Sequence, residues 1–253
     1  AAAAVATWVH AGGVLCGTAG AGTRDEYDHP MDSLVPVFAA ASHGFELRAN
    51  AGRPKYELRS LQTLDVLSSV KAQGRRRVTF DQLCIKETLE PLRGAKIILT
   101  NKDGRPTGTL HRFGRGIAIR LAAAPGITYL HEAVSHKSYD IESYLPTAFP
   151  RDLRDFIARP AKLGNAVRIA ETSAPITEIV RYDCPRRAVV FVIDHEAAPK
   201  KNFVMKLADA SQFTSAYTAT GNPVRLKREA GGVLRIALPL HTADAIVLEE
   251  TAL

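Results

Sequence analysis

Cysteine is scarce in this sequence. Its 253 residues include three cysteines, Cys16, Cys84 and Cys184. They are odd in number, far apart and in no Cys-x-x-Cys pair, so the sequence predicts neither a disulfide framework nor a thiolate zinc site. We interpret all three as reduced thiols with structural roles.

Long apolar runs are also absent. A membrane-spanning helix needs about 18 or more uninterrupted apolar residues. The most apolar stretch, residues 117–130, is broken by Arg120, Pro125 and Gly126. We therefore expect no membrane-spanning helix and no membrane partner.

An initiator methionine is missing as well. Residues 1–9 have the pattern of the middle of an amphipathic helix. We expect the sequence to be a piece of a longer protein, and because a signal peptide can precede such a piece, the sequence assigns no cellular location.

Basic residues are in excess, with 33 Lys and Arg against 26 Asp and Glu and a net charge of +7. Such an excess can indicate a nucleic-acid partner. Here, however, it is concentrated in short, separated clusters beside turn-like segments, at residues 75–77, 200–201 and 225–228. No zinc-ligand spacing or aromatic RNA-binding strand accompanies them, so we expect solvated loops and no nucleic-acid partner.

Residues 1–160 mix helical and strand patterns, which predicts an α/β domain. A helix over the first residues ends at Gly12-Gly13, and residues 14–17 follow as a short apolar strand. A helix is expected over residues 31–41. Further strands are expected over residues 61–67, 77–80 and 95–100, with a hairpin of 107–111 and 116–121 around a glycine turn.

Residues 166–253 have a different pattern. An amphipathic helix over residues 150–157 is expected to connect the two parts, with the boundary between residues 158 and 168. Short strands separated by turn residues, without helical stretches between them, then predict a small antiparallel β-sandwich. The expected strands are 167–170, 176–182, 188–193, 203–207, 213–218, 233–238 and 245–248.

The densest polar stretch follows the first strand, where open α/β sheets place their ligand crevices. It contains our candidate contact residues, Arg24, Asp25, Glu26 and Tyr27. Asp25 and Glu26 are adjacent and so do not form an acid/base pair facing one substrate. A solvated loop, or a set of caps for the helix at Met31, is the alternative.

Two features near this stretch suggest other sites. Cys16 precedes Gly17 as a nucleophile on a sharp strand-to-helix turn would, but the full glycine pattern is absent, and a packed core cysteine is the preferred interpretation. Residues 17–22 are glycine-rich and can present N–H groups to an anion. They lack the lysine of a P-loop, which favours an adaptable loop.

Two histidine-containing stretches invite metal-site interpretations. His131 and His136 are five residues apart, which places them about 140° apart around a helix, so they cannot both reach one zinc ion. Residues 194–196, Asp-His-Glu, end a strand and can bind sugar or metal, although such residues are usually turn formers. We expect no metal and no cofactor.

Short motifs in both parts of the chain resemble one family. They are residues 12–15, residues 22–27 with their Asp-Glu pair, Leu34 and Phe38, residues 113–118, and the strand 187–195 that ends in Asp194-His195. With these motifs the chain resembles the middle, amidotransferase-like trimerisation domain and the small C-terminal β domain of the family 42 glycoside hydrolases. Asp194 stands where that family has Asn, and residues 48–93 and 128–144 fit no part of its pattern.

The resemblance implies an amidotransferase-like (flavodoxin-like) open α/β sheet lacking its first strand, followed by the β-sandwich. It also implies that the two catalytic glutamates lie in an upstream barrel, so that this chain has no catalytic residue. The implied function is a non-catalytic accessory and assembly region of a larger carbohydrate-active enzyme. We expect a homo-oligomer, with a carbohydrate as candidate ligand, in which Arg24 to Tyr27 contact a ligand or a neighbouring subunit.

Two alternatives remain open from the residues alone. The chain can be a stand-alone protein that binds a small polar molecule or sugar with residues 17–28. It can also be a hydrolase that uses Cys16.

Overall fold

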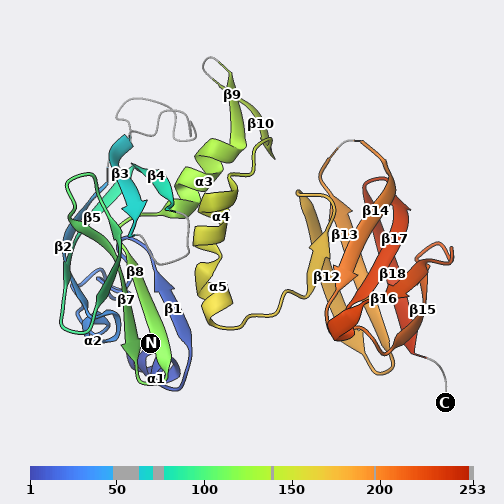
Figure 1. Cartoon of the computed structure of the whole chain (residues 1–253), viewed down its shortest axis with the longest axis horizontal. Coiled ribbons are helices and arrows are strands. Elements are labelled where there is room, and N and C mark those ends of the chain that lie inside the picture. Colours follow the sequence, from blue (N-terminus) through green and yellow to red (C-terminus); the bar gives the residue numbers. More distant parts are fainter. Residues whose placement is uncertain (48–62, 71–76, 138–139, 197, 251–253) are drawn as a thin grey trace. The chain divides into compact units, whose positions relative to one another are not determined.

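The computed structural model describes residues 1–47, 63–70, 77–137, 140–196 and 198–250. The chain divides into two compact units, Ala1–Ala166 and Val167–Leu253 (Figure 1). Each unit has its own apolar core.

A six-stranded mixed sheet forms the centre of the first unit, in the order β1-β8-β7-β6-β3-β4. Strands β1 and β8 run parallel, and the other neighbouring pairs of this sheet run antiparallel. The sheet consists of β1 (Val14–Gly17), β3 (Thr63–Ser69), β4 (Thr79–Leu83), β6 (Lys96–Thr100), β7 (Pro106–Phe113) and β8 (Gly116–Leu121).

Two antiparallel pairs complete the strands of this unit. Strand β2 (Ala40–Leu47) pairs with β5 (Ile85–Pro91), and β9 (Val134–Lys137) pairs with β10 (Asp140–Pro146). The helices are α1 (Ala2–His10), α2 (Val35–Phe38), α3 (Pro125–Ala133), α4 (Arg151–Ile157) and α5 (Arg159–Leu163).

Two apolar clusters hold these elements together. Leu153 and Phe156, spaced i, i+3 on α4, pack with sheet residues such as Leu99 in the larger cluster. The smaller cluster joins α1 and α2 to the sheet through Val9, Phe38 and Ala118 and their neighbours. Burial of these side chains supplies most of the stabilisation of such a layered fold.

The expected helix over residues 31–41 is wrong in extent. Only Val35–Phe38 are helical, because Ala39 adopts the left-handed conformation with φ 46° and the chain then enters β2. The predicted strand 61–67 begins outside the described residues and is observed as β3. The sheet is mixed: β1 and β8 are the one parallel pair among its described strands, and β7 and β8 form the antiparallel hairpin that the glycine turn predicts.

Two four-stranded antiparallel sheets form the second unit, in the orders β11-β14-β17-β16 and β12-β13-β18-β15. Every second residue along these strands faces inward, and the inward residues form one apolar core that includes Val190, Phe203, Met205, Ile236 and Leu248. The strands are β11 (Ala170–Thr172), β12 (Thr177–Cys184), β13 (Arg187–Asp194), β14 (Lys200–Leu207), β15 (Phe213–Thr218), β16 (Arg225–Arg228), β17 (Leu234–Leu240) and β18 (Ala243–Glu250).

Two strands of this unit differ from the sequence expectation. The first strand starts at Ala170 rather than at Val167. Strand β16 falls on the basic cluster 225–228, which we expected to be a solvated loop, and it pairs antiparallel with β17. The second basic cluster, residues 200–201, likewise lies in a strand, at the start of β14. Residues 75 and 76 of the third cluster lie outside the described residues.

Candidate functional site

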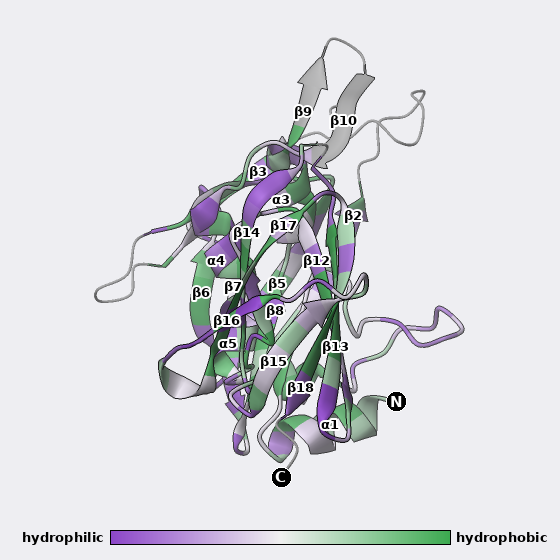
Figure 2. Ribbon diagram, turned by 90° about the vertical axis from the view of Figure 1, so that its right-hand side faces the viewer, coloured by the Kyte–Doolittle hydropathy of each residue, from purple (hydrophilic) through white to green (hydrophobic). Residues whose placement is uncertain are grey.

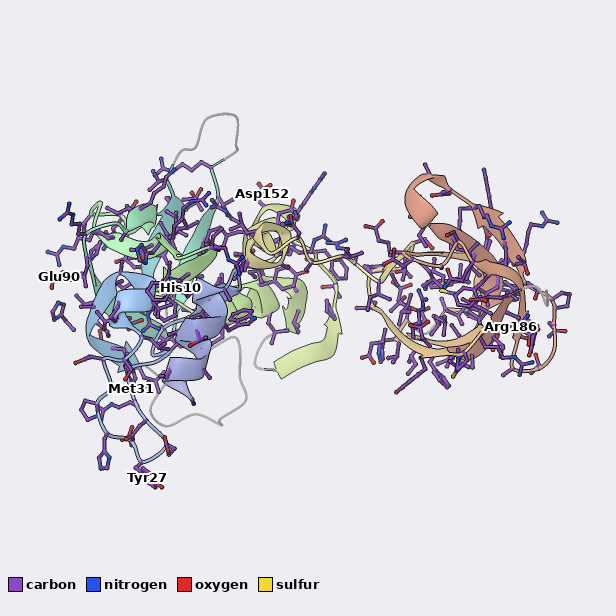
Figure 3. All side chains as sticks on the ribbon, turned by 90° about the horizontal axis from the view of Figure 1, so that it is seen from below. His10, Tyr27, Met31, Glu90, Asp152 and Arg186 are labelled. Atoms are coloured by element: carbon purple, nitrogen blue, oxygen red, sulfur yellow. The ribbon has the colours of Figure 1, made fainter. Side chains whose placement is uncertain are left out.

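The segment from Thr23 to Met31 is a short hairpin-like loop that projects from the first unit, with Tyr27 at its tip (Figure 3). The N–H of Asp25 donates to the carbonyl of His29 at 3.0 Å, and the N–H of Met31 donates to that of Thr23 at 2.9 Å. These bonds hold the two arms of the loop together. The loop is therefore an ordered projection.

The carboxylate of Asp25 builds the turn of this loop. Its Oδ1 accepts the N–H of Tyr27 at 2.9 Å and that of His29 at 2.8 Å, and its Oδ2 lies 3.3 Å from Nδ1 of His29. The backbone bond from His29 is the main cause of the lowered pKa of Asp25. Because these acceptors are occupied within the loop, Asp25 is not available as an acid or base.

The other three candidate residues differ in role. Arg24 donates from Nη1 to the carbonyl of Asp28 at 2.7 Å and so closes the loop. Glu26 and Tyr27 point to solvent, and 74% of Tyr27 is exposed. The structure thus gives Arg24 and Asp25 a scaffolding role and leaves Glu26 and Tyr27 as the side chains that can meet a partner.

A small pocket of about 180 Å³ lies at the base of the loop. Arg24 and Met31 line it from the loop, and Phe38, Phe45 and Arg120 line it from the neighbouring elements. Its lining combines apolar and aromatic side chains with polar groups. Its size suits a small polar molecule or part of a sugar ring.

A buried ion pair lies beneath the glycine-rich residues 17–22. Nη2 of Arg120 on β8 contacts Oε1 of Glu87 on β5, and the side chains are 3% and 0% exposed. Nη1 of Arg120 donates to the carbonyl oxygens of Thr18, at 3.2 Å, and of Ala21. Since the pair is sealed from water, it needs these extra bonds to offset desolvation.

The same ion pair also binds the backbone of the glycine-rich residues 17–22. Oε2 of Glu87 accepts the N–H of Gly20 at 3.3 Å. The carboxylate of Glu87 thus accepts a backbone N–H that an external anion would need. This supports the interpretation of residues 17–22 as a structural loop. Sequence reasoning missed Glu87; the signal that could have revealed the pair is Arg120, a lone charge inside an apolar strand.

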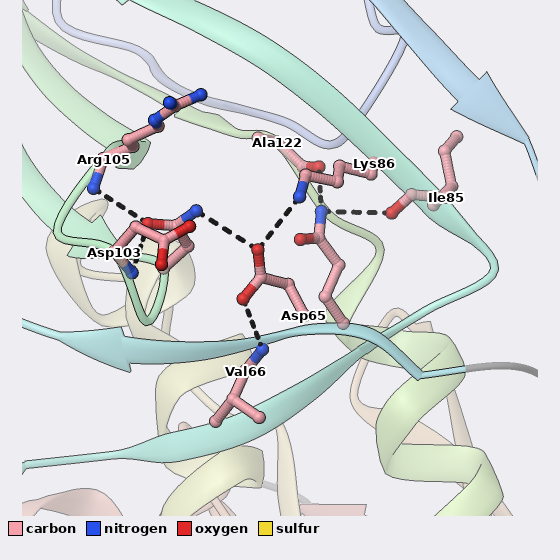
Figure 4. A network of polar contacts seen from close by, with 9 residues as sticks. Asp65, Val66, Ile85, Lys86, Asp103, Arg105 and Ala122 are labelled. Carbon is pink, nitrogen blue, oxygen red and sulfur yellow. Dashed lines mark hydrogen bonds and ion pairs between the residues drawn. The ribbon is translucent and has the colours of Figure 1, made fainter.

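A second buried network surrounds Asp65 on β3 (Figure 4). Oδ2 of Asp65 lies 2.9 Å from Nζ of Lys86 and accepts from Nδ2 of Asn101 at 3.1 Å, while Oδ1 accepts the N–H of Val66 at 2.9 Å. Burial alone would raise the pKa of Asp65, but the bonds from Lys86, Val66 and Asn101 outweigh it, so the pKa is lowered. A carboxylate with this set of partners stabilises the fold and is not a proton donor.

Cys16 lies within β1 and is exposed, so the expectation of a packed core cysteine is wrong at this position. Although its side chain is accessible, the surrounding protein partly desolvates the thiol and raises its pKa. An activated nucleophile needs the opposite shift. Cys84 is buried, and burial raises the pKa of its thiol too.

The two histidine-containing stretches do not form metal sites among the described residues. His131 lies in α3 and His136 in β9, so they do not share a helix. Nζ of Lys200 lies 2.7 Å from Oδ2 of the buried Asp194 and also pairs with Glu196. These partners raise the pKa of Lys200, with Asp194 the larger cause. In the described part of the chain, no group of three or more His, Cys, Asp or Glu can hold a metal ion.

The helices in the described ranges are all too short or too polar to cross a membrane.

Known structures share this fold. The chain matches a β-galactosidase from Bacillus circulans sp. alkalophilus with a TM-score of 0.64 at 14% identity, covering 98% of this chain and 30% of that one. It matches Gan42B, a GH42 β-galactosidase from G. stearothermophilus, with a TM-score of 0.60 at 14% identity and the same coverage. It also matches α-L-fucosidase isoenzyme 2 from Paenibacillus thiaminolyticus, with a TM-score of 0.59 at 13% identity, covering 99% of this chain and 38% of that one.

The chain has the fold of one region of GH42 β-galactosidases. It spans about 30% of the length of these enzymes. No family model and no curated protein matches the sequence itself. The likeness to family 42 that the sequence motifs indicated is therefore confirmed for the fold.

Proposed function

We propose that this chain is a non-catalytic accessory and assembly region of a larger carbohydrate-active enzyme of the β-galactosidase type. One observation carries the proposal: the fold of nearly the whole chain recurs as 30% of a β-galactosidase and 38% of an α-L-fucosidase. These enzymes are named for different sugars. A region common to both is better explained by a shared structural need than by the choice of substrate.

The finer architecture is part of the proposal. The first unit is an amidotransferase-like, flavodoxin-like open sheet lacking its first strand, and the second is a small antiparallel β-sandwich. The parallel pair of β1 and β8 and the single core between the two sheets of the second unit support these assignments.

In this proposal the chain is homo-oligomeric, and the loop from Arg24 to Tyr27 contacts a neighbouring subunit at the rim of its active site. Support comes from the ordered hairpin and from the exposed Tyr27 at its tip. An aromatic side chain on a rigid loop makes contact area at a small cost in conformational entropy.

The proposal is tested by sequencing the genomic DNA upstream of the codon for Ala1. We expect an open frame of about 250 or more codons with a repeating strand–helix pattern and a glutamate at the ends of two strands. The purified 253-residue chain should then leave nitrophenyl galactosides unhydrolysed. A start codon directly before Ala1, or turnover by this chain at enzyme-like rates, would contradict the proposal.

A second candidate function is a stand-alone ligand-binding protein, which the pocket beside Arg24 and Phe38 favours. A ligand that binds the folded state must raise its unfolding temperature. A thermal-shift series with galactose and inorganic phosphate tests this. A concentration-dependent rise that Arg24→Ala abolishes supports binding in the pocket, and no response to either compound removes this candidate.

A further inference from the structure

The two sheets of the second unit differ in charge. The strands of the sheet β11-β14-β17-β16 carry seven Lys and Arg residues and one acid, Glu171. Those of the sheet β12-β13-β18-β15 carry two Arg residues and six Asp and Glu residues. Three of the seven basic residues lie on β16, most of which Figure 2 colours as hydrophilic. The basic cluster 225–228 is therefore part of a sheet with charge of one sign.

The strand register brings basic side chains together on the outer face of this sheet. Arg235 lies between Leu234 and Ile236, which are fully buried, so it faces outward. Its directly opposed neighbours are Lys206 on β14 and Lys227 on β16. Because residues directly opposed in antiparallel strands share a face, the three cations form one row.

Arg225 extends this row along β16. Leu226 packs against the core, so Arg225 and Lys227 on either side of it both point outward, and both are exposed. We call Lys206, Arg225, Lys227 and Arg235 the basic face. Strands lie about 4.8 Å apart and alternate residues about 7 Å apart, so the four positions fall within an area about 10 Å by 7 Å.

The protein neutralises only part of this charge. Oε2 of Glu229 lies 2.7 Å from Nζ of Lys206, while Oε1 of Glu171 lies 3.5 Å from Nη1 of Arg168. The hydrogen bond from Lys206 is the largest cause of the lowered pKa of Glu229, and the charges of two other members of the basic face lower it further. A single carboxylate thus lies in the field of three cations.

The remaining positive charge is available to a partner. In the described ranges, Arg225, Lys227 and Arg235 form no ion pair of their own. Like charges directly opposite one another in a sheet repel and cost stability. A surface that gathers charge of one sign attracts molecules of the opposite sign and raises their local concentration. Charge complementarity therefore selects an anionic partner for this face.

The spacing of the cations suits a chain that repeats its charges. A small anion reaches one or two of these side chains, whereas a polymer lying across the strands meets Lys206, Arg235 and Lys227 in turn, about 4.8 Å apart. The guanidinium groups of Arg225 and Arg235 can each bind a carboxylate through two parallel hydrogen bonds. A polymer with regularly spaced carboxylates fits both features.

The same face is unsuited to nucleic acid. Proteins that bind single strands stack the bases on aromatic side chains, but the one aromatic residue in these four strands, Phe203, is fully buried in the core. The major groove of duplex DNA, about 12 Å wide, admits a helix or a two-stranded ribbon, and a four-stranded sheet with about 4.8 Å between strands is wider than that.

We propose that the basic face binds an acidic polysaccharide through its uronic acid carboxylates. The choice of a carbohydrate over another polyanion rests on the proposed function, in which this chain is part of a carbohydrate-active enzyme. The role assigned to the face is retention of that enzyme on a charged polysaccharide, separate from catalysis.

Binding of the 253-residue chain to polygalacturonate, measured by biolayer interferometry, tests the proposal. We expect saturable binding that weakens as salt is added, because salt screens exposed charges. Fully methyl-esterified polygalacturonate has the same backbone without the charges and should not bind. The double variant Arg225→Thr with Lys227→Thr should raise Kd about fivefold or more. Its urea midpoint should not fall, since threonine suits an edge strand and a like-charge repulsion is removed.

The matched control is Lys96→Thr with Arg112→Thr, which removes the same two charges from exposed strand positions in the first unit. It should bind polygalacturonate within about twofold of the parent. Equal losses in the two double variants would show that binding follows net charge alone, and would overturn the inference. A parent that does not bind polygalacturonate overturns it as well.

Duplex DNA is the last comparison. If it binds as tightly as polygalacturonate and loses affinity equally in Arg225→Thr with Lys227→Thr, the face is a general polyanion surface and the polysaccharide assignment is wrong. None of these results bears on the upstream DNA sequence, which tests the proposed function. The inference can therefore fail while the proposed function stands.

Discussion

Arg120 and Glu87 meet in an ion pair that protein covers on every side, with side chains 3% and 0% exposed. The pair joins β8 to β5 and also binds the backbone of residues 18–21. The loop carrying Arg24 to Tyr27 begins directly after this segment. The position of the candidate contact loop therefore depends on a salt bridge that lies outside it.

Removing one member of this pair should destabilise the fold strongly. Glu87→Ala leaves the Arg120 guanidinium buried without its carboxylate, and such changes cost about 3–5 kcal/mol. Urea unfolding measures the loss. The matched control is Asp155→Ala, which removes exposed ion pairs with Lys162 and Arg151 and should cost far less than Glu87→Ala. Equal effects of the two variants would contradict a structural role for the buried pair.

Much of the fold was predictable because apolar residues alternate in its strands. The hairpin of β7 and β8 and most strands of the second unit lie where the pattern placed them. Strand β5 was not predicted, since Lys86, Glu87 and Glu90 give it the composition of a polar surface segment. The burial of Glu87 depends on Arg120, which is 33 residues away in sequence, and local patterns do not encode such a pairing.

The candidate site was predictable only in part. The density of polar residues located the loop, and the adjacency of Asp25 and Glu26 argued against an acid/base pair. That Asp25 builds the turn depends on the N–H of His29 folding back onto it, which requires φ 64° at Asp28. Residue types alone do not specify that backbone conformation.

Gly116 at the start of β8 should not tolerate a side chain. A Cβ there would collide with the carbonyl oxygens of Val9 and Gly13, which are backbone atoms that cannot rotate away. We expect Gly116→Ala to lower the unfolding free energy by about 1–3 kcal/mol, as other overpacking changes do. Gly126→Ala is the control: no atom lies within 4 Å of its Cβ and it is helical, so it should be neutral or stabilising by up to about 1 kcal/mol.

Stability should fall in acid partly through Asp65. Its pKa is lowered in the folded state from the ordinary value of 3.8, so the folded state binds this proton less readily than the unfolded state. The stabilisation is therefore present above pH 3.8 and is lost as the pH falls through the lower, folded-state pKa. Denaturant unfolding from pH 6 down to about pH 2 should show a shallower pH dependence for Asp65→Asn than for the parent. Identical slopes in the parent and in Asp65→Asn would count against the network.

Thiol titration should separate the cysteines by burial. Cys16 and Cys184 are exposed and Cys84 is buried, so two equivalents should react with Ellman's reagent in the folded protein and the third only on unfolding. Cys84→Ala should lower the total in denaturant and leave the folded count unchanged. Reaction of all three thiols before unfolding would show that the region around Cys84 opens readily.

The order of the loop should depend on Asp25 more than on Tyr27. Asp25→Ala removes the acceptor of two backbone N–H groups and of the His29 ring, so the hairpin loses the bonds that shape its turn. We expect faster cleavage by chymotrypsin after Tyr27, at least fivefold in rate, with the midpoint of global unfolding nearly unchanged because the loop lies outside the cores. Tyr27→Phe keeps a cleavable side chain and the turn, and should be cut at the parent's rate. If Asp25→Ala is cut no faster than Tyr27→Phe, the carboxylate does not hold the loop, and Asp25 becomes free to serve a partner directly.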